Sequence, residues 1–429
     1  MPHPPRQPSA SASPPAGPAS APSPVAGAEG REPLRLLYVS HSFPPAGGLL
    51  ENLGGMQRVA VELHDALAAD PGVRLTTRAL RTSWAATPYR VGPFLGRMLL
   101  ELPRIIRRER IGAVLFSSPV TAALTLPLRP WLARRGVRLG VIAYGLDVTA
   151  TNAAWAGLVR RTFAGMHRVF AISRATAEAC RARGATPEQL RIVPCGVDVD
   201  RFPPVEDRAA ARAELLAGIA GAPVPDGALL LAGVGRHVRR KGFAWFVERV
   251  MPRLPEDVVF LLAGEGPETP SIRDAVARHG LQARVRLLGR VSEDELTRLY
   301  RGADLFVMPN VAVPGDMEGF GVVILEAGLS GLWTVAAGLE GILDAVTPDQ
   351  NGELLPSEDE AAFTAAILRH RDDRAALAGL SRRARGHVQA AYGWAGVADA
   401  FVRELSDSPD QPGSAASPSS GGSSPASTP

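Results

Sequence analysis

Short apolar runs that end in glycine or in a polar loop recur along most of this chain, and helical segments separate them. In the first half the runs cover residues 34–40, 111–118, 137–145, 167–173 and 191–198. In the second half they cover residues 227–235, 258–266, 284–291, 304–310 and 332–338. Continuous apolar runs are typical of parallel strands that helices cover on both faces. The alternation predicts an α/β fold with two doubly wound, Rossmann-like parallel-sheet domains, which bind ligands at the carboxyl ends of their strands.

The two ends of the chain do not share this pattern. Residues 1–32 and 406–429 are rich in Pro, Ala and Ser and contain almost no large apolar side chain. Such segments bury too little surface to offset the entropy of ordering, so we expect both to be disordered tails. Prolines gather around a short Ala-rich helical segment in residues 200–226. We interpret this stretch as the boundary between a first domain at 33–200 and a second at 201–390.

Several classes of protein are disfavoured by the composition. No apolar run is long enough for a transmembrane helix, and the N-terminus lacks the apolar core of a secretory signal. The two cysteines, Cys180 and Cys195, have no metal-ligand spacing and suit a reducing compartment, so we expect a cytoplasmic protein. Residues 33–200 hold 22 arginines against 11 acidic residues. This imbalance favours an anionic partner for the first domain.

The distribution of basic residues marks one loop of the second domain. All of the 47 basic residues except Lys241 are arginines, so a single retained lysine indicates a place where a compact ammonium is needed. Lys241 and Arg236 follow a predicted strand and precede a helix, where two cations and a helix N-terminus could bind a diphosphate. The alternative is a solvated basic patch, and we favour that reading for Arg239 and Arg240.

A second constellation, about 80 residues downstream, contains two carboxylates. Glu318 precedes Gly319, Phe320 and Gly321, and Glu326 follows within an apolar helix. An unpaired carboxylate among apolar residues is unusual. Sugars and riboses present vicinal hydroxyls, and one carboxylate accepts hydrogen bonds from two of them. Together with the cationic loop, this pair indicates a site for a sugar nucleotide.

These motifs resemble those of a known family. The pattern G-x-G-R-x(4)-K-G, then LAGEGP, LLGRV, ADLFVMP and E-G-F-G-x(4)-E, is similar to that of the GT-B fold glycosyltransferases of family 4. The likeness extends through FPPAGGLLENLGGMQRVAVEL, AISRATAEA and IVPCGVDVDRF in the first half. It implies a GT-B fold with an acceptor-binding first domain, a nucleotide-sugar-binding second domain and a central cleft. It also implies that the helix at 391–405 crosses back to the first domain.

For the donor phosphates, the resemblance implies roles in both domains. Arg236 and Lys241 would bind the diphosphate and stabilise the charge of the leaving group. Gly54 and Gly55 would let the loop of the first domain approach the phosphates. Arg58 would assist them or face the acceptor.

For the rest of the donor, the resemblance places the second domain around the nucleoside and the sugar. Glu326 would hold the ribose hydroxyls, and Glu318 would hold hydroxyls of the transferred sugar. The remaining residues implied to line the donor are Gly264, Glu265, Gly266, Arg290 and Val291 along the nucleoside, and Gly319, Phe320 and Gly321 at the sugar. No metal and no cofactor are expected, because the two cations would neutralise the diphosphate. We reject Asp198-Val199-Asp200 as a metal motif, since it lies at the domain junction.

The chain departs from the family pattern at two positions. Cys195 replaces the usual Asn of the domain junction. Tyr144 stands where the family often has a His, and a phenol is a poorer base near neutral pH. Asp147 is the alternative group that would activate the acceptor, and His41 is a weaker candidate.

The resemblance implies transfer of a mannose- or glucose-type hexosyl unit, with retention, to a lipid-linked or glycan acceptor of the cell envelope or an exopolysaccharide. Residues 94–110 and 128–139 mix apolar and basic side chains at helical spacing. They could rest on the inner face of an anionic membrane or simply cover the sheet. Nucleic acid is not expected as a partner of such a transferase. Two alternatives remain open: an epimerase or phosphorylase of the same fold, and a basic binding protein for membrane or nucleic acid with a vestigial nucleotide site.

Overall fold

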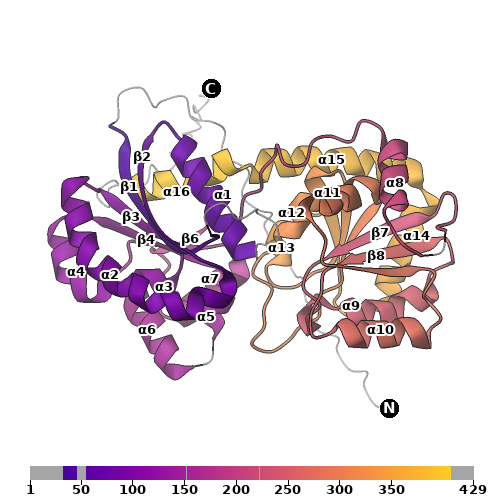
Figure 1. The fold of residues 1–429 in the computed structure, drawn as a ribbon, viewed down its shortest axis with the longest axis horizontal. Coiled ribbons are helices and arrows are strands. Elements are labelled where there is room, and N and C mark those ends of the chain that lie inside the picture. The colour runs from indigo at the N-terminus through magenta and orange to yellow at the C-terminus, as the bar shows by residue number, and fades with distance from the viewer. Residues whose placement is uncertain (1–31, 46–54, 151, 222, 407–429) are drawn as a thin grey trace, which may run out of the picture.

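The computed structural model describes residues 32–45, 55–150, 152–221 and 223–406, which form two lobes side by side (Figure 1). Each lobe is built on a six-stranded sheet in which all pairings between neighbouring strands are parallel. The prediction of an α/β fold with two doubly wound sheets is therefore confirmed. Both predicted tails, apart from Glu32 and Ser406, lie outside the described residues, as does Gly54.

The first sheet has the strand order β2-β1-β3-β4-β5-β6. Its strands are β1 (Leu34–Phe43), β2 (Val73–Arg81), β3 (Ala113–Phe116), β4 (Arg138–Ala143), β5 (Arg168–Ala171) and β6 (Leu190–Ile192). The strands β3 and β4 are buried almost throughout, because helices cover both faces of the sheet. The helices of this lobe are α1 (Gly55–Ala69), a 3₁₀ turn (Trp84–Ala86), α2 (Thr87–Arg108), α3 (Pro119–Ala122), α4 (Thr125–Arg134), α5 (Leu146–Thr149), α6 (Ala153–Phe163) and α7 (Arg174–Ala182).

The second sheet has the strand order β12-β11-β10-β7-β8-β9. Its strands are β7 (Leu229–Val234), β8 (Val258–Ala263), β9 (Val285–Gly289), β10 (Leu305–Met308), β11 (Trp333–Ala337) and β12 (Gly352–Leu355). Its helices are α8 (Arg208–Ala217), α9 (Phe243–Trp245), α10 (Thr269–Arg278), α11 (Glu293–Gly302), α12 (Val322–Leu329), α13 (Ile342–Ala345), α14 (Glu360–Asp372) and α15 (Arg374–Tyr392). The segment predicted as one helix after Gly242 is divided into α9, a π-helical turn (Phe246–Val250) and a 3₁₀ turn (Met251–Arg253). Another 3₁₀ turn spans Arg239–Lys241.

The last helix, α16 (Trp394–Ser406), joins the two lobes (Figure 1). It follows α15 after Gly393 and packs against α1 and β4 of the first lobe. The ring of Trp394 lies where a side chain at Gly196 would be, since a Cβ there would approach the ring to 2.4 Å. Val197 pairs with Gly393 in an isolated parallel bridge. The junction between the lobes is therefore held against the start of α16.

No helix within the described residues is both long and apolar enough to span a bilayer.

Candidate active site

The loop after β7 places the lone lysine beneath the surface. Lys241 is only 7% exposed, whereas Arg236 is exposed. Gly242 adopts a left-handed conformation with φ of 67°, and a Cβ there would lie 1.8 Å from the carbonyl oxygen of Pro309. Only glycine allows this approach of two strand-end loops. The turn that presents Lys241 is thus fixed by contact with the loop after β10.

Lys241 forms a buried ion pair with Glu318. The Lys241 Nζ and Glu318 Oε2 atoms are 2.7 Å apart, and Asn310 donates to the same oxygen at 3.1 Å. Burial alone would raise the pKa of Glu318, but Lys241 and Arg240 outweigh it, so that this pKa lies below its ordinary value. Arg240 also pairs with Asp316 at 2.8 Å. The interpretation of Arg240 as a solvated surface residue is therefore wrong, because its guanidinium belongs to this buried network.

The loop that carries Glu318 touches the first lobe. A Cβ at Gly319 would lie 2.3 Å from the carbonyl oxygen of Tyr144, and one at Gly145 would lie 3.0 Å from the Met317 methyl group. Gly145 has φ of 107°, a conformation that favours glycine. The loops that follow β4 and β10 thus meet at Tyr144 and Gly319, with Glu318 beside the contact.

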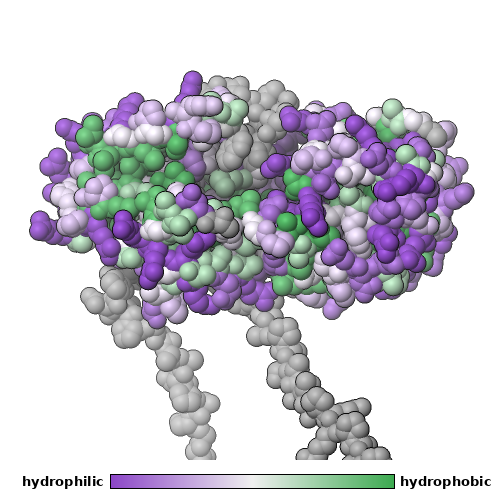
Figure 2. All heavy atoms as spheres, turned by 90° about the horizontal axis from the view of Figure 1, so that it is seen from below, coloured by the Kyte–Doolittle hydropathy of each residue, from purple (hydrophilic) through white to green (hydrophobic). Residues whose placement is uncertain are grey.

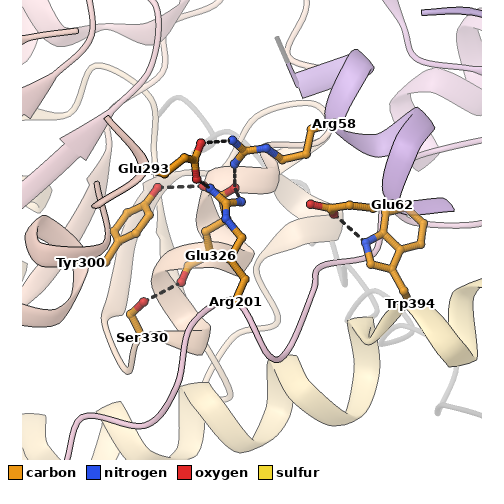
Figure 3. A network of polar contacts seen from close by, with 8 residues as sticks. All are labelled: Arg58, Glu62, Arg201, Glu293, Tyr300, Glu326, Ser330 and Trp394. Atoms are coloured by element: carbon orange, nitrogen blue, oxygen red, sulfur yellow. Dashed lines mark hydrogen bonds and ion pairs between the residues drawn. The ribbon is translucent and has the colours of Figure 1, made fainter. Parts of the chain in front are cut away.

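Glu326 lies in a second polar network that bridges the lobes (Figure 3). Its Oε1 accepts hydrogen bonds from Arg58 at 2.7 Å and from Arg201 at 2.9 Å. Its Oε2 accepts from the buried Tyr300 hydroxyl at 3.1 Å. Both arginines also form ion pairs with Glu293. The carboxylate predicted to hold a ribose is therefore already oriented by three protein donors, of which Arg58 comes from the first lobe.

A further carboxylate, that of Glu62 on α1, lies beside this network. Glu62 accepts a hydrogen bond from the Trp394 indole at 2.7 Å (Figure 3). Burial raises the pKa of Glu62 to about 7, although Trp394 and Arg58 act in the opposite direction. Glu62 can therefore change its charge near neutral pH at the contact between α1 and α16.

The polar residues after β4 form a compact turn. Both carboxylate oxygens of Asp147 accept the backbone N–H of Tyr144, at 2.9 and 3.2 Å. Burial raises the pKa of Asp147 to about 6 against the effect of these backbone donors. The Tyr144 hydroxyl is buried and has no hydrogen-bond partner among the residues that the structure describes, and burial raises its pKa well above the ordinary value. Near neutral pH, Asp147 is better suited than Tyr144 to accept a proton.

His41 lies at the end of β1 and is also buried. Its Nδ1 is 3.3 Å from the Ser118 hydroxyl. Burial lowers the pKa of His41 to about 4, so the ring is neutral at physiological pH.

Contacts between loops account for the glycines predicted to lie along the nucleoside. A Cβ at Gly264 would lie 1.9 Å from the Gly235 carbonyl oxygen, and one at Gly266 would lie 2.4 Å from that of His237. These glycines are required where the loop after β8 packs on the loop after β7. Glu265 and Arg290 form an exposed ion pair at 3.2 Å. Their side chains remain accessible to a ligand.

The remaining predicted residues differ in their surroundings. Gly55 begins α1, and no atom of the described residues lies within 4 Å of where its Cβ would be. Val291 is partly buried against the core, and the Phe320 ring is buried and packs against Tyr392. Gly321 precedes α12 with φ of 92°. Phe320 therefore anchors the loop, and the glycines on either side of it allow close packing against neighbouring groups.

Several residues at the site were not found from the sequence. They are Glu62, Arg201, Glu293, Tyr300, Asn310 and Glu340, whose carboxylate accepts the Glu318 backbone N–H. Arg201 lies within the junction stretch IVPCGVDVDRF, and Asn310 ends the predicted strand run at 304–310. These positions are the signals that could have identified them. The others show no motif, because they reach the site through tertiary packing.

Comparisons with known proteins agree with this architecture. Residues 53–201 match the family model described as Glycosyltransferase Family 4, and residues 228–373 match Glycosyl transferases group 1. A D-inositol 3-phosphate glycosyltransferase of Saccharomonospora viridis is 36% identical over 234 residues, which is 52% of this chain and 51% of that protein. The chain thus spans about half the length of the curated relatives it matches.

Two solved structures are similar in fold across most of this chain. The crystal structure of Anabaena HepE in complex with UDP has a TM-score of 0.66 at 16% identity, covering 87% of this chain and 100% of that one. Sucrose-phosphate synthase from Thermosynechococcus elongatus has a TM-score of 0.66 at 22% identity, covering 86% and 98%. With one family model on each lobe, the chain belongs to the GT-B glycosyltransferases of the family 4, group 1 type.

Proposed function

We propose that this chain is a retaining, metal-independent glycosyltransferase that uses a nucleotide-diphosphate sugar. The match of one glycosyltransferase model to each lobe supports the reaction class. Solved structures of the same fold contain UDP, UDP-glucose or ADP, which supports a nucleotide-sugar donor. The transferred unit would be a hexosyl group of the mannose or glucose type.

The buried pair of Lys241 and Glu318, with the exposed Arg236 on the same loop as Lys241, is the observation that carries the proposal. A diphosphate would bind Arg236 and Lys241, whose positive charges would stabilise the leaving group without a metal ion. Glu318 and the backbone of Gly319 to Gly321 would then hold hydroxyls of the sugar. Because Lys241 contacts Glu318 directly, the same ammonium would link the phosphate end to the sugar end of the donor.

The other end of the donor would lie along the second lobe. The ribose would contact Glu326, and the base would lie near Gly264 to Gly266, Arg290 and Val291. From the first lobe, Gly54 and Gly55 would approach the phosphates. Closure of the lobes around the donor would exclude water and limit its hydrolysis.

The acceptor would approach from the first lobe. Its hydroxyl oxygen would form the new bond to the anomeric carbon on the face from which the diphosphate leaves. Asp147 is the group we propose to take the hydroxyl proton, because burial brings its pKa to about 6. Tyr144 would shape this end of the site through its backbone, which contacts Gly319.

We propose a lipid-linked or glycan acceptor, with a phosphorylated polyol as the alternative that the inositol 3-phosphate transferases suggest. The surface of α2 supports the lipid-linked choice. Leu100 is 69% exposed and Tyr89 83% exposed, and Arg97 and Arg104 extend from the same helix. Figure 2 shows hydrophobic residues gathered on the first lobe, with hydrophilic residues around them. Such a mixture suits contact with an anionic membrane.

A thermal-shift panel of guanosine, uridine and adenosine diphosphates and their sugars tests the donor assignment. A ligand that stabilises the wild type and not Lys241→Ala would identify the donor. If no ligand of the panel raised the melting temperature, the proposal would be overturned in favour of a basic binding protein. Turnover of the donor without any acceptor would instead identify an epimerase.

The finer parts of the proposal have their own measurements. The anomeric configuration of the product, read by NMR, tests retention, and activity in excess EDTA tests metal independence. Sedimentation with phosphatidylglycerol vesicles, compared with phosphatidylcholine vesicles and with Leu100→Asp, tests the membrane contact.

A further inference from the structure

Most of the acceptor capacity of the Glu326 carboxylate is used by protein groups. A carboxylate offers about four lone-pair positions. Three of them receive hydrogen bonds, from Arg58, Arg201 and Tyr300. Glu326 is only 3% exposed, so its acceptor positions are confined to this network. A ribose presents two hydroxyls, and both can bind Glu326 only if one of the three donors leaves.

The three donors differ in how firmly they are held. Tyr300 is fully buried in the second lobe. Arg201 lies in the segment between the lobes, and its guanidinium stacks 4.7 Å from the centre of the Phe202 ring. Arg58 belongs to α1 of the first lobe and reaches Glu326 across the boundary (Figure 3). Any separation of the lobes moves Arg58 away from Glu326, while Tyr300 stays beside it.

Arg58 also has a second carboxylate to bind when Glu326 is taken. One of its terminal nitrogens contacts Glu326 and the other contacts Glu293. Arg201 divides its two terminal nitrogens between the same carboxylates. While the lobes stay together, Arg58 can therefore leave Glu326 and remain paired with Glu293, which avoids an unpaired buried charge.

We propose that Arg58 is a displaceable latch, which ties the lobes together through Glu326 and competes with the donor ribose for that carboxylate. Arg201 and Tyr300 act as positioning residues that keep Glu326 in place during the exchange. The inference rests on the proposed binding of ribose by Glu326. It assigns Arg58 a role opposite to assistance, because the residue lowers donor affinity until it is displaced.

The test compares a nucleoside diphosphate with its 2′,3′-dideoxy analogue, which has the same charge and no ribose hydroxyls. Dissociation constants are measured by calorimetry for the wild type and for Arg58→Met, using the base identified by the panel. We expect Arg58→Met to bind the ribonucleotide about five- to tenfold more tightly, equivalent to about 1 to 1.4 kcal/mol. Binding of the dideoxy analogue should not change.

Two further variants separate competition from other effects. Arg174→Met removes another contact between the lobes, the 2.8 Å ion pair with Asp344, without touching Glu326. It should leave the preference for ribose unchanged. Arg58→Lys keeps the charge but cannot span both carboxylates, so it should show a smaller gain. Circular dichroism and melting temperature show that each variant is folded.

Each outcome distinguishes the latch from the proposed function. Suppose that the wild type binds the ribonucleotide no more tightly than the dideoxy analogue, with the same result for Glu326→Gln. In that case ribose binding by Glu326 is wrong, and the proposed latch is wrong with it. If ribose is preferred but Arg58→Met weakens the ribonucleotide or leaves it unchanged, the latch alone is overturned. An equal gain for both nucleotides, or a matching gain in Arg174→Met, would also overturn it.

Discussion

The two lobes present opposite electrostatic environments at the facing ends of their sheets. In the second lobe, the carboxylates Glu318 and Glu326 are buried and paired with cations. In the first lobe, burial shifts the pKa of His41 and Asp147 towards their uncharged forms. Both sheets are six-stranded and parallel, although their strand orders differ. The electrostatic difference lies in the side chains that each lobe places at its strand ends.

The difference indicates which kind of ligand group each lobe is suited to bind. Paired charges in the second lobe can exchange one partner for a charged ligand at little cost, because the site is already polar and organised. Groups held near neutrality in the first lobe suit an uncharged hydroxyl and the transfer of its proton. Four predictions test this contrast, from the largest expected effect to the smallest.

The largest loss of activity should follow removal of Lys241 from the second lobe. Lys241→Met should lower kcat/KM by about 10²- to 10³-fold, as loss of a donor that stabilises developing negative charge typically does. Initial rates with the identified donor measure this change. Arg239→Met is the matched control, because Arg239 is exposed two residues earlier; it should stay within about twofold of wild type. Comparable losses in both variants would show that only the overall charge of the loop matters.

The contact between the halves should be the next most sensitive feature. Gly319→Ala places a methyl group against the Tyr144 carbonyl, where only 2.3 Å is available. The lobes must then stay farther apart, and we expect kcat to fall about 10- to 100-fold because small misplacements of reacting groups are costly. Gly379→Ala, in open space on α15, serves as the control. An unchanged kcat would mean that the lobes need not come this close during the reaction.

Asp147 of the first lobe should determine how kcat/KM depends on pH. Wild-type kcat/KM should fall as the pH drops through about 6, because a general base must be ionised and burial raises the pKa of Asp147 to about 6. Asp147→Asn keeps an acceptor for the Tyr144 N–H, and should lose about tenfold at pH 7.5 together with this acid limb. If the variant retains the same limb, the proton goes to another group.

The smallest effect should come from Glu62, whose replacement should change how the melting temperature depends on pH. Burial raises its folded-state pKa from 4.5 to about 7. The resulting stabilisation is present below pH 4.5 and is lost as the pH rises through 7, because the folded protein then has to hold a buried anion. Glu62→Gln is never charged, so its melting temperature relative to wild type should rise by about 3 °C between pH 5 and pH 8. The exposed Glu178→Gln should show no such trend, and a pH-independent difference for Glu62→Gln would contradict the shift.

The sequence was informative where local pattern determines structure. Apolar runs identified the central strands, since strands such as β4 and β8 are buried on both faces. The edge strand β2 (Val73–Arg81) was missed because polar residues interrupt it and only Val73 is buried. The short β12 was missed as well. The helix expected after Gly242 is irregular, and Pro252 lies in its last turn.

The candidate site was predictable only in part. Lys241 and Glu318 were singled out by residue type and spacing, and they meet in an ion pair. The partners of Glu326 were not predictable, since Arg58 lies 268 residues away along the chain. Gly264 and Gly266 were noticed for their place after a strand, but their loop-to-loop contacts depend on packing that no local pattern contains.

The position of α16 has a consequence for how the protein is made. The ring centroids of Phe401, on α16, and Phe170, on β5 of the first lobe, are 4.6 Å apart. Leu405 fills the space beside Gly140 of β4. A ribosome synthesises this helix only after the whole second lobe, so the first lobe emerges with part of its apolar surface uncovered. Domains that emerge first usually fold first during synthesis. Here the first domain to emerge would be completed only after the second has been synthesised. Until then, the apolar surface that α16 covers would be open to chaperones.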